Sequence, residues 1–99
     1  MSATSLTEQA RAAALAEATS RGWKSVDGRD AITKTFVFQD FSQAFAWMTR
    51  VATFAEQVNH HPEWSNVYRT VEVTLMTHDV NGLSALDFSM ASKMDALAE

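Results

Sequence analysis

The strongest constraint on the fold is an amphipathic segment that follows Asp40 and ends before Pro62, the only proline in the chain. Apolar residues recur in it three and four positions apart, which predicts one face of a helix: Phe41, Ala44, Phe45, Met48, Ala52, Ala55 and Val58. Asp40 and Gln43 have side chains suited to cap its first turn. Because Pro62 cannot continue a helix and disfavours helical backbone at the residue before it, we expect His60, His61 and Pro62 to form an extended loop.

Strands are predicted on both sides of this helix. Four short segments are rich in strand-forming residues, and the longer ones alternate apolar with polar positions: residues 23–26 and 31–38 before the helix, and residues 64–68 and 70–77 after it. Asp27-Gly28-Arg29-Asp30 separates the first two segments as a hairpin turn does. Asn81-Gly82 marks a further turn after the last segment.

A helix is expected at each end of the chain. Ser5-Leu6-Thr7-Glu8 has the pattern of a capping box ahead of the helix-forming residues 9–20, and Gly22 is suited to end that helix. Ser84 and Asp87 form a second capping-box pattern. The helix that follows has its own apolar stripe: Leu83, Leu86, Met90, Met94 and Leu97.

The resulting order of elements, α-β-β-α-β-β-α, predicts an α+β fold. Four short strands joined by turns or by one helix favour a single four-stranded antiparallel sheet, with the three helices packed on one face to cover its apolar side. A length of 99 residues suits a single domain, which we place over residues 1–99. A small sheet with open edges gains from pairing with another copy, so we expect a homo-oligomer.

Composition argues against several classes of function. A formal net charge of −4 has the wrong sign for a protein that neutralises phosphates, so we expect no direct binding to nucleic acid. The absence of cysteine rules out disulfides, thiolate catalysis and cysteine-bound metal. Residues 1–18 have no hydrophobic signal-peptide core, and no apolar run is long enough to span a membrane. We therefore expect a soluble, cytoplasmic protein.

The first functional signal is the clustering of all three histidines, His60, His61 and His78, within nineteen positions. Histidine titrates near neutrality, so two histidines can supply an acid and a base at the same pH. Three unrelated surface histidines are the alternative. A metal site that also used Asp79 or Glu56 is less favoured, because adjacent side chains on an extended segment point to opposite sides. The pattern thus favours acid–base chemistry without a metal.

Carboxylates and aromatic residues near the histidines have two interpretations each. Glu56 stands near a helix end, where the dipole disfavours a carboxylate, so it is either a solvated surface residue or a partner of the histidines. Asp87 could cap the last helix and also turn an oxygen towards an imidazole. Trp64 and Tyr68 could form an aromatic wall for a planar heterocycle or belong to the core. The spacing alone leaves these alternatives open.

Longer motifs bring in a resemblance to a known family. The run Glu56-Gln57-Val58-Asn59-His60-His61-Pro62-Glu63-Trp64, continued by Asn66-Val67-Tyr68 and by Leu75-Met76-Thr77-His78, resembles the pterin-4a-carbinolamine dehydratase family. The likeness extends over residues 22–97. It implies an α+β fold with a four-stranded antiparallel sheet and three helices, in agreement with the pattern, and an assembly of dimers or tetramers.

The same resemblance implies a chemistry. The family's reaction is loss of water from a 4a-hydroxytetrahydropterin, formed by aromatic amino-acid hydroxylases, to give quinonoid dihydropterin in tetrahydrobiopterin recycling, with no metal or organic cofactor. By resemblance, five residues are catalytic. His60 and His78 are acid and base, in an order that the resemblance leaves open, His61 orients the substrate and shares in proton transfer, and Glu56 and Asp87 support the imidazoles. The resemblance also implies a set of substrate-binding residues: Asn59, His60, His61, Trp64, Met76, Thr77, His78 and Asp79.

A binding role is the alternative function. Animal members of the family bind the dimerisation helices of a homeodomain transcription factor, which makes such a helix a possible partner. That role would use the exposed face of the second helix, with four residues in its packing surface: Arg50, Thr53, Phe54 and Gln57. Phe54 lies off the predicted apolar stripe and suits a partner helix or a second copy of the chain, of which self-association is the simpler account. A catalytically idle relative is disfavoured, because both carboxylates and all three histidines are present together.

Overall fold

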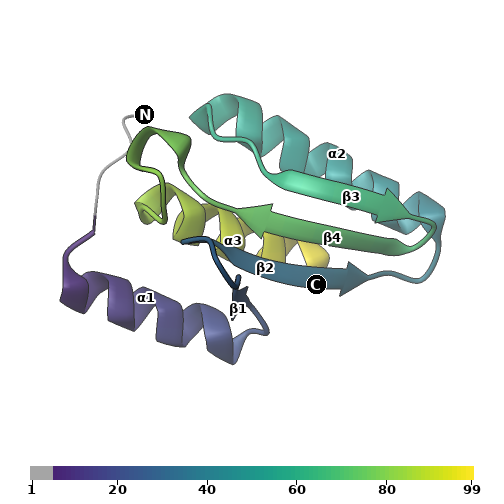
Figure 1. Cartoon of the computed structure of the whole chain (residues 1–99). Helices are drawn as coiled ribbons and strands as arrows, with labels where there is room; N and C mark the ends of the chain where they lie inside the picture. Colours follow the sequence, from purple (N-terminus) through teal and green to yellow (C-terminus); the bar gives the residue numbers. More distant parts are fainter. Residues whose placement is uncertain (1–5) are drawn as a thin grey trace.

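Three helices and four strands follow one another in the predicted order (Figure 1). The computed structural model describes residues 6–99. The elements have these bounds: α1 Glu8–Ser20, β1 Lys24–Ser25, β2 Ile32–Val37, α2 Phe41–Val58, β3 Glu63–Val67, β4 Thr70–Leu75, the 3₁₀-helix η1 His78–Val80, and α3 Ala85–Ala98. The predicted α+β class and α-β-β-α-β-β-α order are confirmed. None of the helices described is both long and apolar enough to cross a bilayer.

All four strands pair antiparallel, in the spatial order β1-β2-β4-β3. β4 is interior, between β2 and β3, and its alternate side chains Val71, Val73 and Leu75 are buried. Glu72, between them, is exposed on the opposite face. The helices lie on the buried side of the sheet (Figure 1), so the predicted packing on one face is confirmed.

The face that α2 turns towards the core differs from the predicted one. Its buried residues are Ala44, Trp47, Val51 and Ala55. The predicted stripe is wrong for three residues that are exposed: Phe41, Phe45 and Ala52. Trp47 sets the rotation, because its ring packs against Phe36 with centroids 4.5 Å apart and its Nε1 donates to the carbonyl oxygen of Met94 at 3.1 Å. Burial of this large side chain outweighs the exposure of two phenylalanines.

Side-chain caps begin the first two helices. Oδ1 of Asp40 accepts from the N–H of Gln43 at 2.8 Å, which confirms the predicted cap of α2. α1 begins later than the capping-box pattern predicts, because Thr7 is its N-cap and the Thr7 hydroxyl accepts from the N–H of Ala10 at 3.1 Å. Ser5, the predicted cap, lies outside the described residues.

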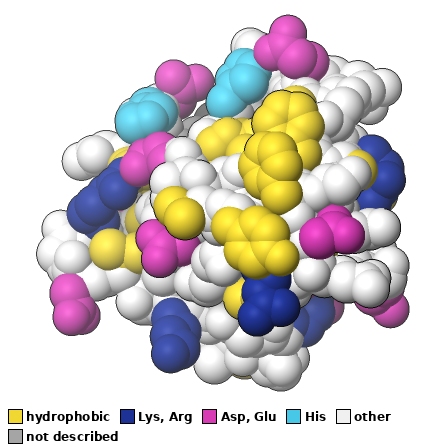
Figure 2. Space-filling view, turned by 90° about the vertical axis from the view of Figure 1, so that its right-hand side faces the viewer, with side chains coloured by type: hydrophobic (Ala, Val, Ile, Leu, Met, Phe, Trp, Pro, Cys, Tyr) yellow, Lys and Arg dark blue, Asp and Glu magenta, His cyan; other side chains and the backbone are white. Residues whose placement is uncertain are grey.

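One end of the molecule exposes large apolar side chains. It is the end where β2 and β3 finish and α2 begins (Figure 1), and we call its five exposed residues the apolar end: Val37, Phe41, Phe45, Val67 and Tyr68. The rings of Phe41 and Phe45 lie 5.7 Å apart. Figure 2 looks onto this side of the molecule and shows hydrophobic side chains gathered in a band. β3 is also an edge strand, so unpaired backbone groups run alongside this surface.

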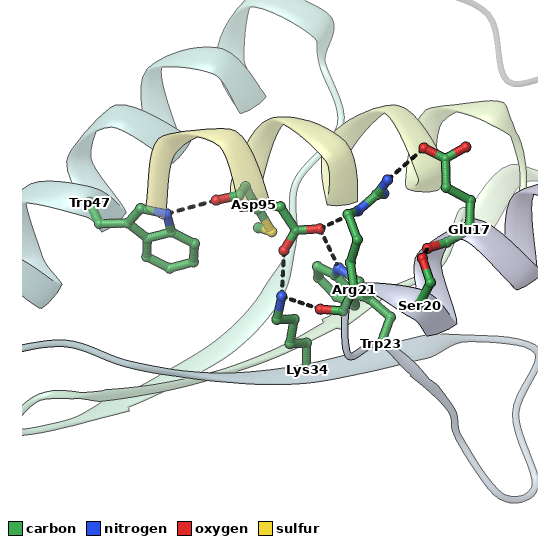
Figure 3. Close-up of polar contacts among 8 residues, drawn as sticks. Glu17, Ser20, Arg21, Trp23, Lys34, Trp47 and Asp95 are labelled. Atoms are coloured by element: carbon green, nitrogen blue, oxygen red, sulfur yellow. Dashed lines mark hydrogen bonds and ion pairs between the residues drawn. The ribbon is translucent and has the colours of Figure 1, made fainter. Parts of the chain in front are cut away.

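A cluster of charged side chains ties α1, β2 and α3 together (Figure 3). Oδ2 of Asp95, on α3, accepts from Nε of Arg21 at 2.8 Å and from Nε1 of Trp23 at 3.0 Å. Oδ1 of Asp95 accepts from Nζ of Lys34 at 2.6 Å, and the same ammonium group donates to the carbonyl oxygen of Arg21. The hydrogen bond to Asp95 raises the pKa of the Arg21 guanidinium. The Asp95 carboxylate thus fixes the end of α1 and strand β2 against α3.

Candidate active site

Three segments meet at the end of the sheet where β3 begins and β4 ends (Figure 1). They are the loop between α2 and β3, the segment from the end of β4 through η1, and the start of α3. A cavity of about 370 Å³ lies between them, and all three histidines line it. Four more of the predicted substrate-binding residues line the same cavity: Asn59, Met76, Thr77 and Asp79.

The end of α2 positions His60. Asn59 has left-handed backbone, with a φ of 52°, and ends the helix there. Asparagine tolerates this conformation better than most residues do. The N–H of His60 then donates to the carbonyl oxygen of Ala55 at 3.0 Å, and Pro62 leads the chain into β3. His60 is buried as a result, with 7% of its surface exposed.

A carboxylate without exposed surface holds His60. Nε2 of His60 lies 2.7 Å from Oδ1 of Asp87, and Asp87 is 0% exposed. Oδ2 of Asp87 accepts from the hydroxyl of Thr77 at 2.7 Å and from the N–H of Ser84 at 2.9 Å. Asp87 therefore caps α3 and contacts an imidazole at once, which the sequence had left as two compatible interpretations. With both carboxylate oxygens bonded, the orientation of the His60 ring is restricted.

His61 has a partner of another kind. Its Nε2 lies 2.6 Å from Oε1 of Glu56, and the two side chains are 56% and 80% exposed. The adjacent histidines thus contact carboxylates on different helices, Glu56 on α2 and Asp87 on α3. Solvent screens the exposed pair, so it contributes little to stability. Within residues 6–99, no three histidine, aspartate or glutamate side chains are grouped as ligands for a metal ion.

His78 reaches the cavity from the end of β4. The strand stops at Leu75, two residues earlier than predicted, because Thr77 leaves the ladder with β2 and pairs with Gly82. The N–H of Thr77 donates to the carbonyl oxygen of Gly82 at 2.8 Å. The short helix η1 then begins at His78, which is exposed and lines the cavity. The tight turn therefore brings His78 to the same cavity as the His60 loop.

Two aromatic residues near the histidines in sequence do not line the cavity. The ring of Trp64 lies 6.2 Å from the ring of Trp47 and packs against the core. Tyr68 is exposed at the apolar end. Conversely, three residues that sequence reasoning missed do line the cavity: Pro62, Glu63 and Leu86. Adjacency to the histidine pair was the available signal for the first two, whereas Leu86 belonged to the predicted stripe of α3.

An ion pair lies at the edge of the cavity. Arg29, in the turn between β1 and β2, donates from Nη1 to Oε1 of Glu63 at 3.0 Å and from Nη2 to Oε2 at 2.7 Å. These hydrogen bonds lower the pKa of Glu63, and the charge of His78 acts in the same direction. They also raise the pKa of Arg29. Glu63 is therefore ionised beside the histidines at neutral pH.

The sequence that builds this cavity matches a known family over almost its whole length. Residues 4–97 match the family described as pterin 4 alpha carbinolamine dehydratase. The chain belongs to this family. The expected resemblance is thus confirmed, and membership supports a pterin carbinolamine dehydratase function.

Individual dehydratase-family proteins are similar to this chain along most of their length. A protein of Jannaschia sp. (strain CCS1), provisionally named pterin-4-alpha-carbinolamine dehydratase, is 63% identical over 94 residues, which cover 95% of this chain and 96% of that protein. A protein of Ruegeria pomeroyi with the same provisional name is 59% identical over 92 residues, covering 93% and 95%. The similarity therefore spans both the sheet and the histidine segments.

Two solved structures share the fold of this chain. A crystal structure from Brucella melitensis, described as a transcriptional coactivator/pterin dehydratase, has a TM-score of 0.89 and 50% identity, with 97% of this chain and all of that chain covered. A pterin dehydratase-like protein described as a RuBisCO assembly factor in the alpha-carboxysome has a TM-score of 0.67 and 23% identity, covering 78% and 89%. The second likeness concerns the fold alone.

Proposed function

We propose that this protein is a 4a-hydroxytetrahydropterin dehydratase, a hydro-lyase that forms quinonoid dihydropterin in the recycling of tetrahydrobiopterin. The observation that supports this most directly is the pair of His60 and Asp87 at a cavity that His78 also lines. Membership of the dehydratase family supports the pterin as substrate.

The reaction needs two proton transfers and no change of oxidation state. A proton must reach the 4a-hydroxyl oxygen as the C4a–O bond breaks and water leaves. N5 must lose its proton as its electron pair forms the C4a=N5 double bond. One protonated and one neutral imidazole meet both needs near neutral pH, and we propose His60 and His78 as this pair. Proton exchange with water afterwards restores both histidines.

The neighbouring residues have supporting roles in this proposal. Asp87 holds the His60 imidazole in one tautomer and orientation, and Glu56 does the same more weakly for His61, which orients the pterin. Thr77 donates to Asp87 and so links the end of β4 to the start of α3. Four further residues that line the cavity are proposed to bind the substrate: Asn59, Met76, Thr77 and Asp79. Trp64, also predicted to bind it, packs against the core instead. This mechanism uses no metal or organic cofactor.

The proposed activity is tested by generating a 4a-hydroxytetrahydropterin and following its decay by stopped-flow absorbance. Decay that accelerates in proportion to catalytic amounts of the protein is the expected result. Decay at the buffer rate would contradict the proposed activity. Unchanged rates after treatment with EDTA are expected as well, and inhibition that zinc reverses would contradict the metal-free mechanism.

We also propose that the apolar end is the contact surface of a homodimer or homotetramer. Phe41 and Phe45 are exposed on it, and the unpaired edge of β3 runs beside it, so a second copy could cover both. Phe54, predicted to suit a partner helix or a second copy of the chain, is instead half-buried against the core with Nζ of Lys93 over its ring at 5.4 Å. The aromatic residues that this contact surface exposes are therefore Phe41, Phe45 and Tyr68.

Analytical ultracentrifugation tests the assembly. The native chain is expected to sediment as a dimer or tetramer, and the F41S/F45S variant as a smaller species. If both sediment as monomers, the assembly proposal is wrong. A native monomer that binds a helical transcription-factor segment through Phe41 and Phe45 would instead support the coactivator role.

A further inference from the structure

A second cavity adjoins the first. It has a volume of about 330 Å³ and is lined by the turn between β1 and β2, including Arg29, and by Asn81 after η1. Met76 and His78 line both cavities, so the two cavities meet at these side chains. A ligand seated beside His78 in the first cavity therefore has a neighbouring space into which a substituent can extend.

Among residues 6–99, Arg29 is the only arginine or lysine that lines either cavity. Its guanidinium donates twice to Glu63 and once, from Nη2, to Sδ of Met76 at 2.7 Å. A guanidinium carries five N–H donors. Within residues 6–99, the hydrogen bonds of this group account for three of them, which leaves Nε–H and one Nη1–H for an additional acceptor.

We propose that the second cavity is a subsite for the substituent at C6 of the pterin, and that Arg29 is a specificity-determining residue that donates hydrogen bonds to hydroxyl oxygens of this substituent. The inference rests on the proposed dehydratase function, because it places the pterin ring beside His78. Arg29 acts only on the C6 substituent and does not contact the reacting atoms.

The charge balance defines the class of substituent. The bidentate contact with Glu63 neutralises the Arg29 guanidinium, so an anionic tail gains little attraction at this site. A neutral hydroxylated chain needs only donors, which the guanidinium still has. The subsite is therefore expected to favour hydroxyalkyl substituents over methyl, which makes no hydrogen bond, and over a carboxylate-bearing tail, which the neutralised guanidinium does not attract.

The experiment compares kcat/KM for 4a-hydroxytetrahydropterins that carry dihydroxypropyl, methyl or a carboxylated tail at C6. In the native protein the dihydroxypropyl substrate is expected to be preferred. In Arg29→Ala the preference over methyl is expected to fall about tenfold, the size of one hydrogen bond to a charged group. In Glu63→Gln the carboxylated substrate is expected to gain relative to the other two. The ratio between substrates cancels any general effect of a variant on folding or turnover.

Arg69→Ala is the matched control, because Arg69 is exposed in the turn between β3 and β4 at the opposite end of β4. Its substrate ratios should equal those of the native protein, whereas an unchanged ratio in Arg29→Ala would overturn the subsite. Dissociation constants of stable 7,8-dihydropterins with the same substituents, measured by fluorescence quenching, provide a second readout. Loss of the hydroxyalkyl preference in Arg29→Ala without any turnover would support the subsite and contradict the dehydratase. Turnover without any loss of this preference in Arg29→Ala would support the dehydratase and contradict the subsite.

Discussion

Nε2 of His60 lies 2.7 Å from Oδ1 of Asp87, and Asp87 has no exposed surface. Replacing Asp87 by Asn removes the charge and presents an amide to groups that donate to the carboxylate. We expect dehydration to slow about 100-fold, at the lower end of what a positioned acid or base contributes. We also expect the free energy of unfolding to fall by about 1–3 kcal/mol. Stopped-flow decay and urea unfolding measure the two effects.

Asp40→Ala is the control for Asp87→Asn, because it should lower the stability of the fold without changing the site. Asp40 caps α2 at the end of the helix remote from His60, and loss of such a cap costs about 0.5–2 kcal/mol. Its rate per folded molecule should equal that of the native protein. The pH–rate profile adds a second criterion, since a shift of its limbs in Asp87→Asn but not in Asp40→Ala is expected. Equal profiles for both variants would mean that Asp87 has only a structural role.

Replacing Glu56, the partner of His61, is expected to slow dehydration less than replacing Asp87 does. Glu56 is 80% exposed, and exposed pairs contribute at most about 1 kcal/mol. Glu56→Gln is therefore expected to lower kcat/KM less than tenfold and to leave the unfolding midpoint almost unchanged. A loss as large as that of Asp87→Asn would contradict the difference in roles that we assign to the two carboxylates.

Asp95 is expected to dominate stability outside the cavity. Its side chain is 13% exposed and accepts from Arg21, Trp23 and Lys34, so Asp95→Ala removes the one carboxylate that two cations and an indole N–H share. We expect a loss of about 2–4 kcal/mol in the free energy of unfolding. Glu17→Ala, which removes the exposed partner of Arg21, should cost less than about 1 kcal/mol. Equal losses, measured by urea unfolding, would refute this ranking.

The ion pair of Asp30 with Arg11 is expected to make the stability of the fold depend on pH. The hydrogen bond from Arg11 lowers the pKa of Asp30 below its ordinary value of 3.8, and the N–H of Leu83 acts in the same direction. A lowered folded-state pKa means that the stabilisation is complete above the unfolded-state pKa and is lost as the pH falls through the folded-state value. The difference in melting temperature between the native protein and Asp30→Asn should thus be present at pH 6 and close towards pH 2. A difference between the two proteins that persists at pH 2 would contradict the assignment.

Local chemistry made part of the fold predictable. The caps at Asp40 and Ser84 depend on residues within one helical turn, and the alternation of Val71, Val73 and Leu75 reflects the period of a strand. The rotation of α2 was not predictable in this way, because its sequence has two overlapping apolar stripes. Packing of Trp47 against β2 and α3 selects one of them, and that contact joins residues far apart in the chain.

Most of the residues that line the candidate site were predictable from the sequence, whereas the contacts between them were less so. The motif around His60 pointed to the histidines. The capping-box pattern indicated that the Asp87 carboxylate could cap α3 and also reach an imidazole with one oxygen. The contact between them depends on how α3 docks beside the end of α2, which no local pattern encodes. The inward placement of Trp64 likewise follows from its pairing with Val73 in the sheet register. The contact of Arg29 with Glu63 joins a turn to a distant strand and had no signal in the sequence.

Acid–base catalysis by His60 and His78 is tested by the rate of decay of 4a-hydroxytetrahydropterin in the presence of the His60→Ala/His78→Ala double variant. We expect decay at the buffer rate, with circular dichroism and sedimentation equal to those of the native protein, which itself accelerates the decay. Acceleration by the folded double variant at the native rate would contradict the assignment of acid–base catalysis to these two histidines.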